Sequence, residues 1–456
     1  MGKLFGTDGV RGIVNKELTP ELALQLGLSI GAFFGEGSKI LVGRDVRRGR
    51  EMLFKAVVSG LLSSGVKVYD AGLLPTPTLQ YAIKHFNYDG GVMITASHNP
   101  PKYNGIKVMG PNGVEVSREQ ERKIEEIFFS EKWKRADIYN VVEEVPKQFG
   151  IIDSYINAIL RHVDVEKIKS KRFRVLIDPA NSVGALTSPK IAKKLGCKVY
   201  TINGHLDEDF PGREPEPTTE TLRETAEVAK SLNVDVAVGH DGDADRAIFI
   251  DEKGRIHWGD RSAAIICKYF AEKGFKGKVV TAVSSSILIE EVLKPYGLEV
   301  VWTKVGSVDI SHLMLKMGSE VLCGFEENGG FMYPPHIPVR DGGMTLALML
   351  QVLADSGRKL SELFNELPHY FTLKTKIPML KSEALKVVEK VAEYFKKERL
   401  IRIDGVKVLM KDAWVLVRPS GTEPILRIMA EAKDEEKLKE IVEIVKKIAE
   451  ETVGKK

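Results

Sequence analysis

Three aspartates at alternate positions are the most chemically suggestive feature of this 456-residue sequence. Asp241, Asp243 and Asp245 stand in the stretch DGDADR, which follows the apolar run VDVAV. Three carboxylates so close together repel one another unless a divalent cation neutralises them, and ligation by oxygen alone suits Mg²⁺ or Ca²⁺. We therefore expect a cation site here, and the alternative is a solvated acidic turn.

The same stretch partly matches the calcium loop of an EF-hand. Arg246, however, stands at the sixth position, where that loop needs a glycine for its turn. The flanking segments VDVAV and AIFID also have the composition of strands, whereas an EF-hand loop is flanked by helices. We reject the EF-hand and expect Mg²⁺ at this loop.

A serine and a histidine lie side by side in TASHNP, directly after the apolar run GVMI. A lone serine hydroxyl is a weak nucleophile and a weak metal ligand, whereas a phosphoserine carries about −1.5 to −2 charges at neutral pH. A phosphoryl group on Ser97 that faced the three aspartates through Mg²⁺ would be suited to phosphoryl transfer. The alternative is an ordinary proline-rich turn that exposes Ser97 and His98.

Two further loops have the composition of ligand sites. VRPSGTEP follows the apolar run AWVLV and combines a guanidinium, two hydroxyls and a glycine, which together would form a phosphate site. GFEENGG supplies the carboxylate of Glu326 and the amide of Asn328, which suit the vicinal hydroxyls of a sugar. Arg11 and Arg44 are weaker candidates for binding anions. A surface turn or a glycine-rich connection is the alternative in each case.

The bulk composition excludes several classes of protein. Apolar residues make up 43% and charged residues 29% of the chain, which is typical of a globular protein, and the formal net charge is only +4. So small a charge argues against nucleic acid as the main partner. No run of about 18 apolar residues occurs, and the three cysteines are widely spaced. We expect a cytoplasmic protein that does not bind membranes.

Strand and helix patterns alternate from residue 39 onward. The pattern predicts strands at 39–45, 66–72 and 91–95 and helices at 50–65 and 76–86, with Thr76 as the N-cap of the second helix and Pro77 as its first residue. This alternation is typical of a parallel, doubly wound sheet. Ligands bind beyond the carboxyl ends of the strands in such a sheet, which is where the polar loops fall.

The alternation recurs twice, and the last part of the chain has a different order of elements. We expect an α/β protein of four domains, three of them doubly wound α/β domains and the last a C-terminal α+β domain. The predicted boundaries are 1–149 with the serine loop, 150–252 with the metal loop, 253–368 with the sugar loop, and 369–456 with the phosphate loop.

The motifs GTDGVRG, TASHNP, NGIK, DGDADR, GFEENGG and RPSGTEP occur in this order, and the chain resembles the α-D-phosphohexomutases. This superfamily contains phosphoglucomutase, phosphomannomutase and phosphoglucosamine mutase. The resemblance covers essentially the whole chain and implies four domains around a central active-site cleft.

The resemblance also implies roles for individual residues. Ser97 would be the catalytic phosphoserine and would join Asp241, Asp243 and Asp245 as a ligand of Mg²⁺. The residues near the transferring phosphoryl group would be Arg11, His98, Lys107 and Arg246, with Lys107 as the best candidate for the general base if its pKa is depressed. The substrate-binding residues would be Glu326, Asn328, Arg418, Ser420, Gly421, Thr422 and Arg427.

The implied reaction interconverts hexose 1-phosphates and hexose 6-phosphates through a hexose 1,6-bisphosphate, which is both intermediate and activator. The partners would be small sugar phosphates, and the protein would be a monomer or a homodimer. The sequence departs from the family pattern at Asn328, where serine is common, and at Gly330 and Ser307, where many members have histidine. We expect mannose and glucose phosphates as substrates. Phosphoglucosamine mutase is the alternative, and a metal-dependent phosphatase and a non-catalytic sugar-phosphate sensor are more remote ones.

Overall fold

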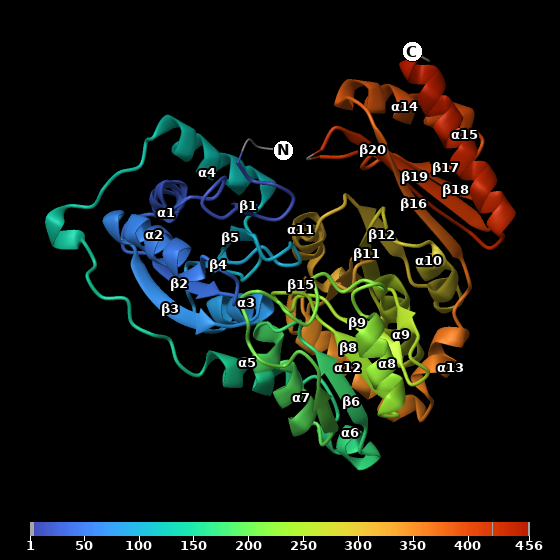
Figure 1. The fold of residues 1–456 in the computed structure, drawn as a ribbon, viewed down its shortest axis with the longest axis horizontal. Helices are drawn as coiled ribbons and strands as arrows, with labels where there is room; N and C mark the ends of the chain where they lie inside the picture. Colours follow the sequence, from blue (N-terminus) through green and yellow to red (C-terminus); the bar gives the residue numbers. More distant parts are fainter. Residues whose placement is uncertain (1–3, 422, 455–456) are drawn as a thin grey trace.

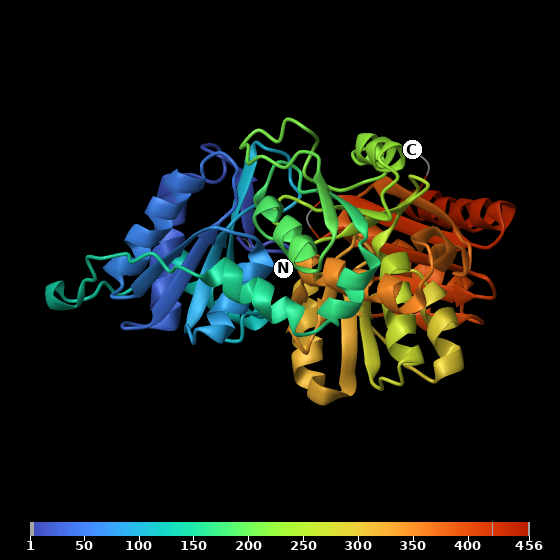
Figure 2. The same cartoon turned by 90° about the horizontal axis from the view of Figure 1, so that it is seen from below.

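A computed structural model describes residues 4–421 and 423–454, which fold into four domains, each with its own five-stranded sheet. The first and the fourth domains lie at opposite ends of the long axis of the molecule, and the second and third lie between them (Figures 1 and 2). The first three sheets are mixed and the fourth is antiparallel throughout. The predicted four-domain architecture is therefore confirmed.

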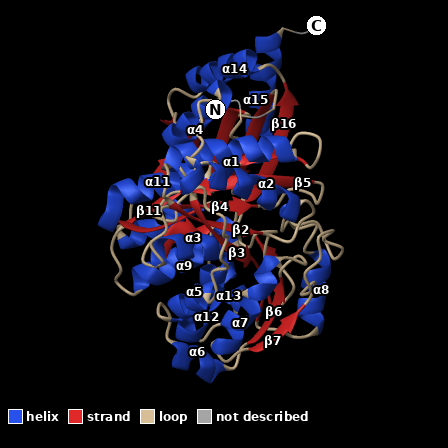
Figure 3. Cartoon of the chain, turned by 90° about the vertical axis from the view of Figure 1, so that its left-hand side faces the viewer, coloured by secondary structure: helices blue, strands red, loops and turns tan. Residues whose placement is uncertain are grey.

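The first sheet has a parallel core and an antiparallel flank. Its strands are arranged in the order β1 (Val10–Ile13), β5 (Tyr103–Met109), β4 (Gly90–Ile94), β2 (Lys39–Arg44) and β3 (Lys67–Leu73). The parallel strands β3, β2 and β4 are the predicted ones. Strand β5 runs antiparallel to β4, and β1 runs antiparallel to β5; neither strand was predicted. The helices are α1 (Pro20–Phe34), α2 (Arg50–Ser63), α3 (Thr76–His85) and α4 (Arg118–Ser130). Helices α1 and α2 lie side by side against this sheet (Figure 3).

The second and third sheets repeat this arrangement. The second has the order β7 (Lys198–Thr201), β6 (Arg174–Asp178), β8 (Val236–Gly239), β9 (Ile248–Asp251) and β10 (Ile256–His257). The third has the order β12 (Val300–Thr303), β11 (Lys278–Ala282), β13 (Val321–Phe325), β14 (Phe331–Tyr333) and β15 (Ile337–Arg340). In each, the first three strands are parallel and the last two antiparallel. The three domains are thus structural repeats.

Helices surround these two sheets. They are α5 (Ile151–Leu160), α6 (Val165–Lys171), α7 (Ser188–Lys194) and α8 (Arg223–Ser231) before the metal-loop hairpin, and α9 (Gly259–Glu272), α10 (Leu288–Leu293), α11 (Ser307–Met317), α12 (Gly342–Ser356) and α13 (Leu360–Asn365) after it. Helix α12 is buried along almost its whole length and packs against α5, α6, α7 and α9, so it anchors the second and third domains to one another. In the described part of the chain, no helix combines the length and the apolar character needed to cross a bilayer.

The repeats place three polar loops at equivalent positions. The serine loop follows β4, the metal loop follows β8 and the sugar loop follows β13, and each of these strands is the third parallel strand of its sheet. Each loop then turns into an antiparallel strand. The expectation that the polar loops lie at the carboxyl ends of parallel strands is confirmed, and their common topology explains why they can meet.

The fourth domain carries the phosphate loop on an antiparallel sheet. Its order is β16 (Phe371–Pro378), β20 (Ile425–Ala432), β19 (Ala413–Pro419), β18 (Val406–Met410) and β17 (Arg399–Ile401). Helices α14 (Lys381–Tyr394) and α15 (Glu435–Val453) pack against this sheet and against each other. The phosphate loop is the turn between β19 and β20, so two paired strands fix both of its ends.

The prediction that Thr76 is the N-cap of α3 is wrong. The helix begins at Thr76, and Pro75 is the N-cap residue. The hydroxyl of Thr76 instead donates a hydrogen bond to Oδ2 of Asp243 at 2.6 Å, across the interface between the first two domains. Because this buried carboxylate competes for the hydroxyl, the side chain serves a tertiary contact and not the cap.

Lys407 of β18 joins the fourth domain to the third. Its ammonium lies 4.0 Å from the ring centroids of Trp302 and Trp414 and donates to the carbonyl oxygen of Ser285 at 2.5 Å. The side chain is fully buried. Burial lowers the pKa of Lys407 from 10.5 to about 7, although nearby carboxylates act in the opposite direction.

This lowered pKa predicts a pH-dependent stability. Between pH 7 and pH 10.5 the unfolded chain keeps the proton on Lys407 and the folded chain loses it, so the free energy of unfolding should rise with pH in this window. The gain is at most about 1.4 kcal/mol per pH unit. Denaturant unfolding at pH 7 and pH 9 should show wild type gaining stability relative to Lys407→Met. A difference between the two proteins that does not change with pH would contradict this assignment.

Candidate active site

Ser97 occupies a strained and buried position at the end of β4. Its backbone φ is +51°, in the left-handed region that residues other than glycine rarely adopt, and its side chain is fully buried. Oγ donates a hydrogen bond to Oδ2 of Asp241 at 2.7 Å, and the backbone N–H donates to Oγ1 of Thr95 at 2.9 Å. Strain of this kind persists only where the surroundings impose it, and it is frequent at functional sites.

Arg47 and Gly242 impose this conformation. The Arg47 side chain is fully buried, pairs with Asp45 at 2.7 Å and donates to the Ser97 carbonyl oxygen at 2.6 Å. Gly242 allows the metal loop to approach, since a β-carbon there would lie 2.4 Å from the same carbonyl oxygen. The glycine in DGDADR is therefore needed to bring the serine loop and the metal loop into contact.

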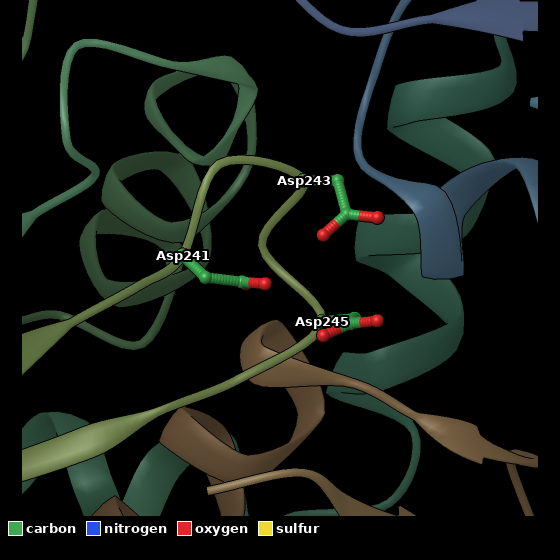
Figure 4. A group of neighbouring side chains, drawn as sticks. All are labelled: Asp241, Asp243 and Asp245. Carbon is green, nitrogen blue, oxygen red and sulfur yellow. The ribbon is translucent and has the colours of Figure 1, made fainter. Parts of the chain in front are cut away.

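The three aspartates of the metal loop gather around one space (Figure 4). One carboxylate oxygen from each of Asp241, Asp243 and Asp245 can be chosen such that all three lie within 4.8 Å of one another. All three side chains are buried. Burial raises the pKa of Asp241 well above its ordinary value, and the charges of Asp245 and Asp243 raise it further.

These carboxylates fit a hard divalent cation. Oδ1 of Asp243 and Oδ1 of Asp245 are buried and have no hydrogen-bond donor among the described residues. A buried carboxylate oxygen without a partner is costly, and a cation with oxygen ligands would remove that cost. Three carboxylates and no nitrogen or sulfur ligand is a donor set that suits Mg²⁺.

Lys107 of β5 lies among the same carboxylates. Its ammonium is 3.1 Å from Oδ2 of Asp243, 3.2 Å from Oδ2 of Asp8 and 3.7 Å from Oδ2 of Asp245. Burial alone would lower the pKa of Lys107, but these carboxylates outweigh it and raise the pKa above its ordinary value. The described surroundings thus favour the protonated ammonium, and the role of general base stays a prediction.

His98, Arg246 and Arg11 complete the charged surroundings of Ser97. Nη2 of Arg246 lies 2.9 Å from Nδ1 of His98, which is itself 3.4 Å from Oγ of Ser97. Burial lowers the pKa of His98 well below its ordinary value, and Arg246 and Arg11 lower it further, so the imidazole is neutral at neutral pH. Arg11 of β1 donates to Oδ1 of Asn99 at 2.6 Å, which ties this strand to the serine loop.

The sugar loop meets this cluster through its glutamate. The Glu326 carboxylate is buried, and Oε2 lies 3.0 Å from Nη1 of Arg340. Burial raises the pKa of Glu326, although Arg340 and Arg246 oppose the rise. Oδ1 of Asn328 accepts a 3.3 Å hydrogen bond from the N–H of Gly330, so part of this amide serves the turn itself.

The phosphate loop faces the other domains across a cavity of about 710 Å³. Nη2 of Arg418 lies 3.1 Å from Oδ2 of Asp404, and Arg427 is its partner in the register of β19 and β20. Thr422 lies outside the described residues. The cavity is lined from three domains by residues that include Gly6, Arg118, Lys304, Asp309, Arg418, Ser420 and Gly421.

The structure therefore brings most of the predicted residues into two groups. Ser97, His98, Arg11, Lys107, Arg246, Glu326 and the three aspartates form one contiguous network, and the phosphate loop lies apart from it on the wall of the cavity. The N-terminal loop, residues 4–9, links the two groups, because Asp8 belongs to the network and Gly6 lines the cavity.

Sequence reasoning missed several members of the network: Asp8, Arg47, Thr76, Glu115 and Arg340. Asp8 lies within the quoted motif GTDGVRG, three residues before Arg11, and that spacing was a usable signal. Burial and the neighbouring Asp8 raise the pKa of Glu115 to about 8, so its carboxyl group is mostly protonated at neutral pH. Arg340 and Arg47 lie in no pattern that indicates chemistry, and only the tertiary structure reveals them.

Known proteins share both the sequence pattern and the fold of this chain. The chain matches the family described as "Phosphoglucomutase/phosphomannomutase" over all of its domains: alpha/beta/alpha domain I at residues 2–135, domain II at 153–254, domain III at 258–371 and the C-terminal domain at 375–448. A solved structure of a family protein from Burkholderia thailandensis, 22% identical, superposes with a TM-score of 0.87 over 98% of this chain and 97% of its own.

Two curated relatives match over nearly their whole length. One, from Sulfurisphaera tokodaii, is named "Phosphoglucosamine/phosphogalactosamine mutase" and is 58% identical over 99% of this chain and 100% of its own. The other, from Thermococcus kodakarensis, is named "Phosphoglucomutase/phosphomannomutase" and is 46% identical, again over 99% and 100% of the two chains.

Proposed function

Because the chain belongs to the phosphoglucomutase/phosphomannomutase family of the α-D-phosphohexomutase superfamily, and is therefore a phosphohexomutase isomerase, we propose that it acts on amino-hexose phosphates. The observation that carries this choice is the 58% identity, over almost the whole of both chains, to the relative named for glucosamine and galactosamine phosphates. The relative named for glucose and mannose phosphates is less similar, at 46%. Those sugars, expected from the sequence alone, thus become the second candidate.

The chemistry begins at Ser97. In the phosphorylated enzyme, the bond between phosphorus and Oγ of Ser97 breaks as the free hydroxyl of the sugar monophosphate attacks phosphorus, and a hexose 1,6-bisphosphate forms. The hydroxyl proton passes to a base, for which the neutral imidazole of His98, 3.4 Å from Oγ of Ser97, is the nearest candidate. Lys107 stays the base expected from the sequence, although its surroundings favour the protonated ammonium. The bisphosphate then turns over, and Oγ of Ser97 accepts the other phosphoryl group.

The remaining residues bind and orient. Arg11 and Arg246 place guanidinium groups near Ser97, where they would stabilise negative charge on the moving phosphoryl group. Mg²⁺ held by Ser97, Asp241, Asp243 and Asp245 would supply a positive charge that offsets the same negative charge. Burial of Ser97 keeps water away from it. A mutase needs this exclusion of water, because water would otherwise hydrolyse the phosphoserine.

The phosphate that is not transferred would bind to the loop of the fourth domain. Arg418, Ser420, Gly421, Thr422 and Arg427 are the proposed contacts. Because they belong to a different domain from Ser97, the sugar could turn over between two separate phosphate positions. Glu326 and Asn328 would bind the sugar. The carboxylates of Glu326 and, on the cavity wall, of Asp309 are suitable acceptors for a 2-ammonium group.

A comparison of four substrates tests this function. With Mg²⁺ and a trace of glucose 1,6-bisphosphate, we expect kcat/KM for glucosamine 1-phosphate and galactosamine 1-phosphate to exceed that for glucose 1-phosphate and mannose 1-phosphate by at least about tenfold. A preference for glucose or mannose phosphate would overturn the proposed sugar, but the protein would still be a phosphohexomutase. Accumulation of inorganic phosphate without isomerisation would indicate a phosphatase.

Several other expectations stay predictions: the domain boundaries at residues 149, 252 and 368, the location in the cytoplasm, and the choice between monomer and homodimer. Mg²⁺ as the cation is proposed on the donor set of the metal loop. Small sugar phosphates as substrates follow from membership of the family.

A further inference from the structure

Arg340, at the end of β15, lies where loops of three domains meet. Its Nη2 is 2.6 Å from Oδ2 of Asp245 in the metal loop and 3.2 Å from Oδ2 of Asp8 in the N-terminal loop. Its Nη1 is 3.0 Å from Oε2 of Glu326 in the sugar loop. Only 6% of the side chain is exposed. A planar guanidinium that contacts three carboxylates from different loops fixes their relative positions, which a lysine could not do equally well.

The sugar loop is shaped to admit this arginine. A β-carbon on Gly330 would lie 2.4 Å from Cδ and 2.7 Å from Cγ of Arg340, well inside any tolerated contact. Gly330 is not among the described glycines with φ in the left-handed region, so the constraint on this position is space and not backbone conformation. Arg340 thus fills the volume that a side chain at residue 330 would take, and it supplies a cation there from a different strand.

The contacts of Arg340 also leave a specific oxygen free. Oδ1 of Asp245 is buried without a hydrogen-bond donor among the described residues, while Oδ2 faces the guanidinium. An ion pair that served stability alone would be expected to satisfy both oxygens of its buried partners. Here the arginine holds one oxygen of Asp245 and leaves the other available to a ligand.

We propose that Arg340 is a positioning residue that holds the sugar-binding carboxylate of Glu326 in register with the cation-binding carboxylate of Asp245. Sugar and cation are thereby kept in a fixed relation to Ser97. This inference rests on the proposed function, because it takes Glu326 as the contact to the sugar. It adds a residue of the third domain to the metal loop of the second, and it explains why residue 330 is glycine in this chain.

Three variants and one matched control test the proposal. Arg340→Met removes the guanidinium, Arg340→Lys keeps the charge, and Gly330→Ala keeps Arg340 but pushes against its side chain. Arg358→Met is the control, since Arg358 belongs to the same domain and makes only surface ion pairs with Glu362 and Glu366 among the described residues. Two experiments are made: steady-state kinetics give kcat and KM for glucosamine 1-phosphate, and calorimetry without sugar gives the affinity for Mn²⁺.

We expect Arg340→Met to lower kcat/KM by about 100-fold, as a displacement near 1 Å can, with KM raised by about tenfold. Arg340→Lys should recover part of the loss, and Gly330→Ala should lower kcat/KM by about tenfold although no charge changes. The affinity for Mn²⁺ should fall by about tenfold in Arg340→Met. The direction of the change in Mn²⁺ affinity is decisive, because loss of the nearby guanidinium charge would by itself strengthen Mn²⁺ binding.

Tighter Mn²⁺ binding in Arg340→Met, or kcat/KM within about threefold of wild type, would overturn the proposal. So would an equal loss in Arg358→Met. If wild type isomerised none of the four sugar phosphates, the proposed function would fail, whereas the Mn²⁺ titrations would still report on the position of Asp245. If Arg340→Met does not fold, the kinetics and the Mn²⁺ affinity are measured on Arg340→Lys and Gly330→Ala instead.

Discussion

Ser97→Ala is expected to abolish isomerisation, with a fall in kcat of about 10⁴-fold or more. The proposed reaction needs Oγ of Ser97 twice, once to deliver a phosphoryl group and once to accept one, and alanine can do neither. Phosphorus NMR of glucosamine 1-phosphate incubated with the variant should show no 6-phosphate product. The fold should survive, since the substitution removes one buried hydroxyl and its hydrogen bond to Asp241.

Ser64→Ala is a suitable control for this experiment. Ser64 is also a buried serine of the first domain, but its hydroxyl bonds to helix carbonyl oxygens and lies outside the network around Ser97. Ser64→Ala should retain wild-type activity, and its free energy of unfolding should fall only slightly. Residual activity of Ser97→Ala above about a hundredth of wild type would show that another group transfers the phosphoryl group.

Removal of divalent cations should both inactivate the enzyme and destabilise it. Offsetting charge on a moving phosphoryl group is worth several kcal/mol, so chelation is expected to lower kcat by about 10³-fold. The cation would also screen the three buried carboxylates of the metal loop in the folded chain only. At a concentration of 100 times its Kd, it should therefore stabilise the fold by about 2.7 kcal/mol. Thermal unfolding with and without Mg²⁺ measures this contribution.

Asp243→Asn separates the metal loop from nonspecific effects of salt. This variant should lose the dependence of Tm on Mg²⁺, because it removes one carboxylate of the triad and leaves the other two. Asp209→Asn, which changes an exposed aspartate paired with Arg48, should keep the wild-type response. A wild-type Tm that did not respond to Mg²⁺, or full activity in chelator, would refute the assignment of the cation site.

The sequence predicts those parts of the site in which several chemically reactive residues lie within a few positions of one another. The alternate aspartates of the metal loop and the TASHNP turn indicate their roles through residue types within a few positions. Alternation of strand and helix also predicts that such loops lie at the carboxyl ends of strands, as they do. The loop after β19 is equally dense in polar residues, and its phosphate-binding role stays a prediction.

The parts that could not be predicted depend on contacts across domains. Arg340 is followed by Asp341 and two glycines, which indicates a helix start, and nothing local shows that its guanidinium reaches Asp245 and Glu326. Thr76 has the local pattern of a helix cap, yet Asp243 takes its hydroxyl. The sequence AIFID, which contains β9, was predicted to be a strand, but the antiparallel pairing in the first three sheets was not predicted. Short strands such as β10 have little periodicity of their own.

The most direct test of the account is the chemical state of Ser97 during turnover. Mass spectrometry of the peptide that contains Ser97 should show one added phosphoryl group after incubation with glucose 1,6-bisphosphate and Mg²⁺. The group should be lost again when excess glucosamine 6-phosphate is added and the released bisphosphate is removed, since the phosphoserine then transfers its phosphoryl group to the sugar and cannot regain one. Isomerisation that proceeds at full rate while Ser97 stays unmodified would contradict the central claim.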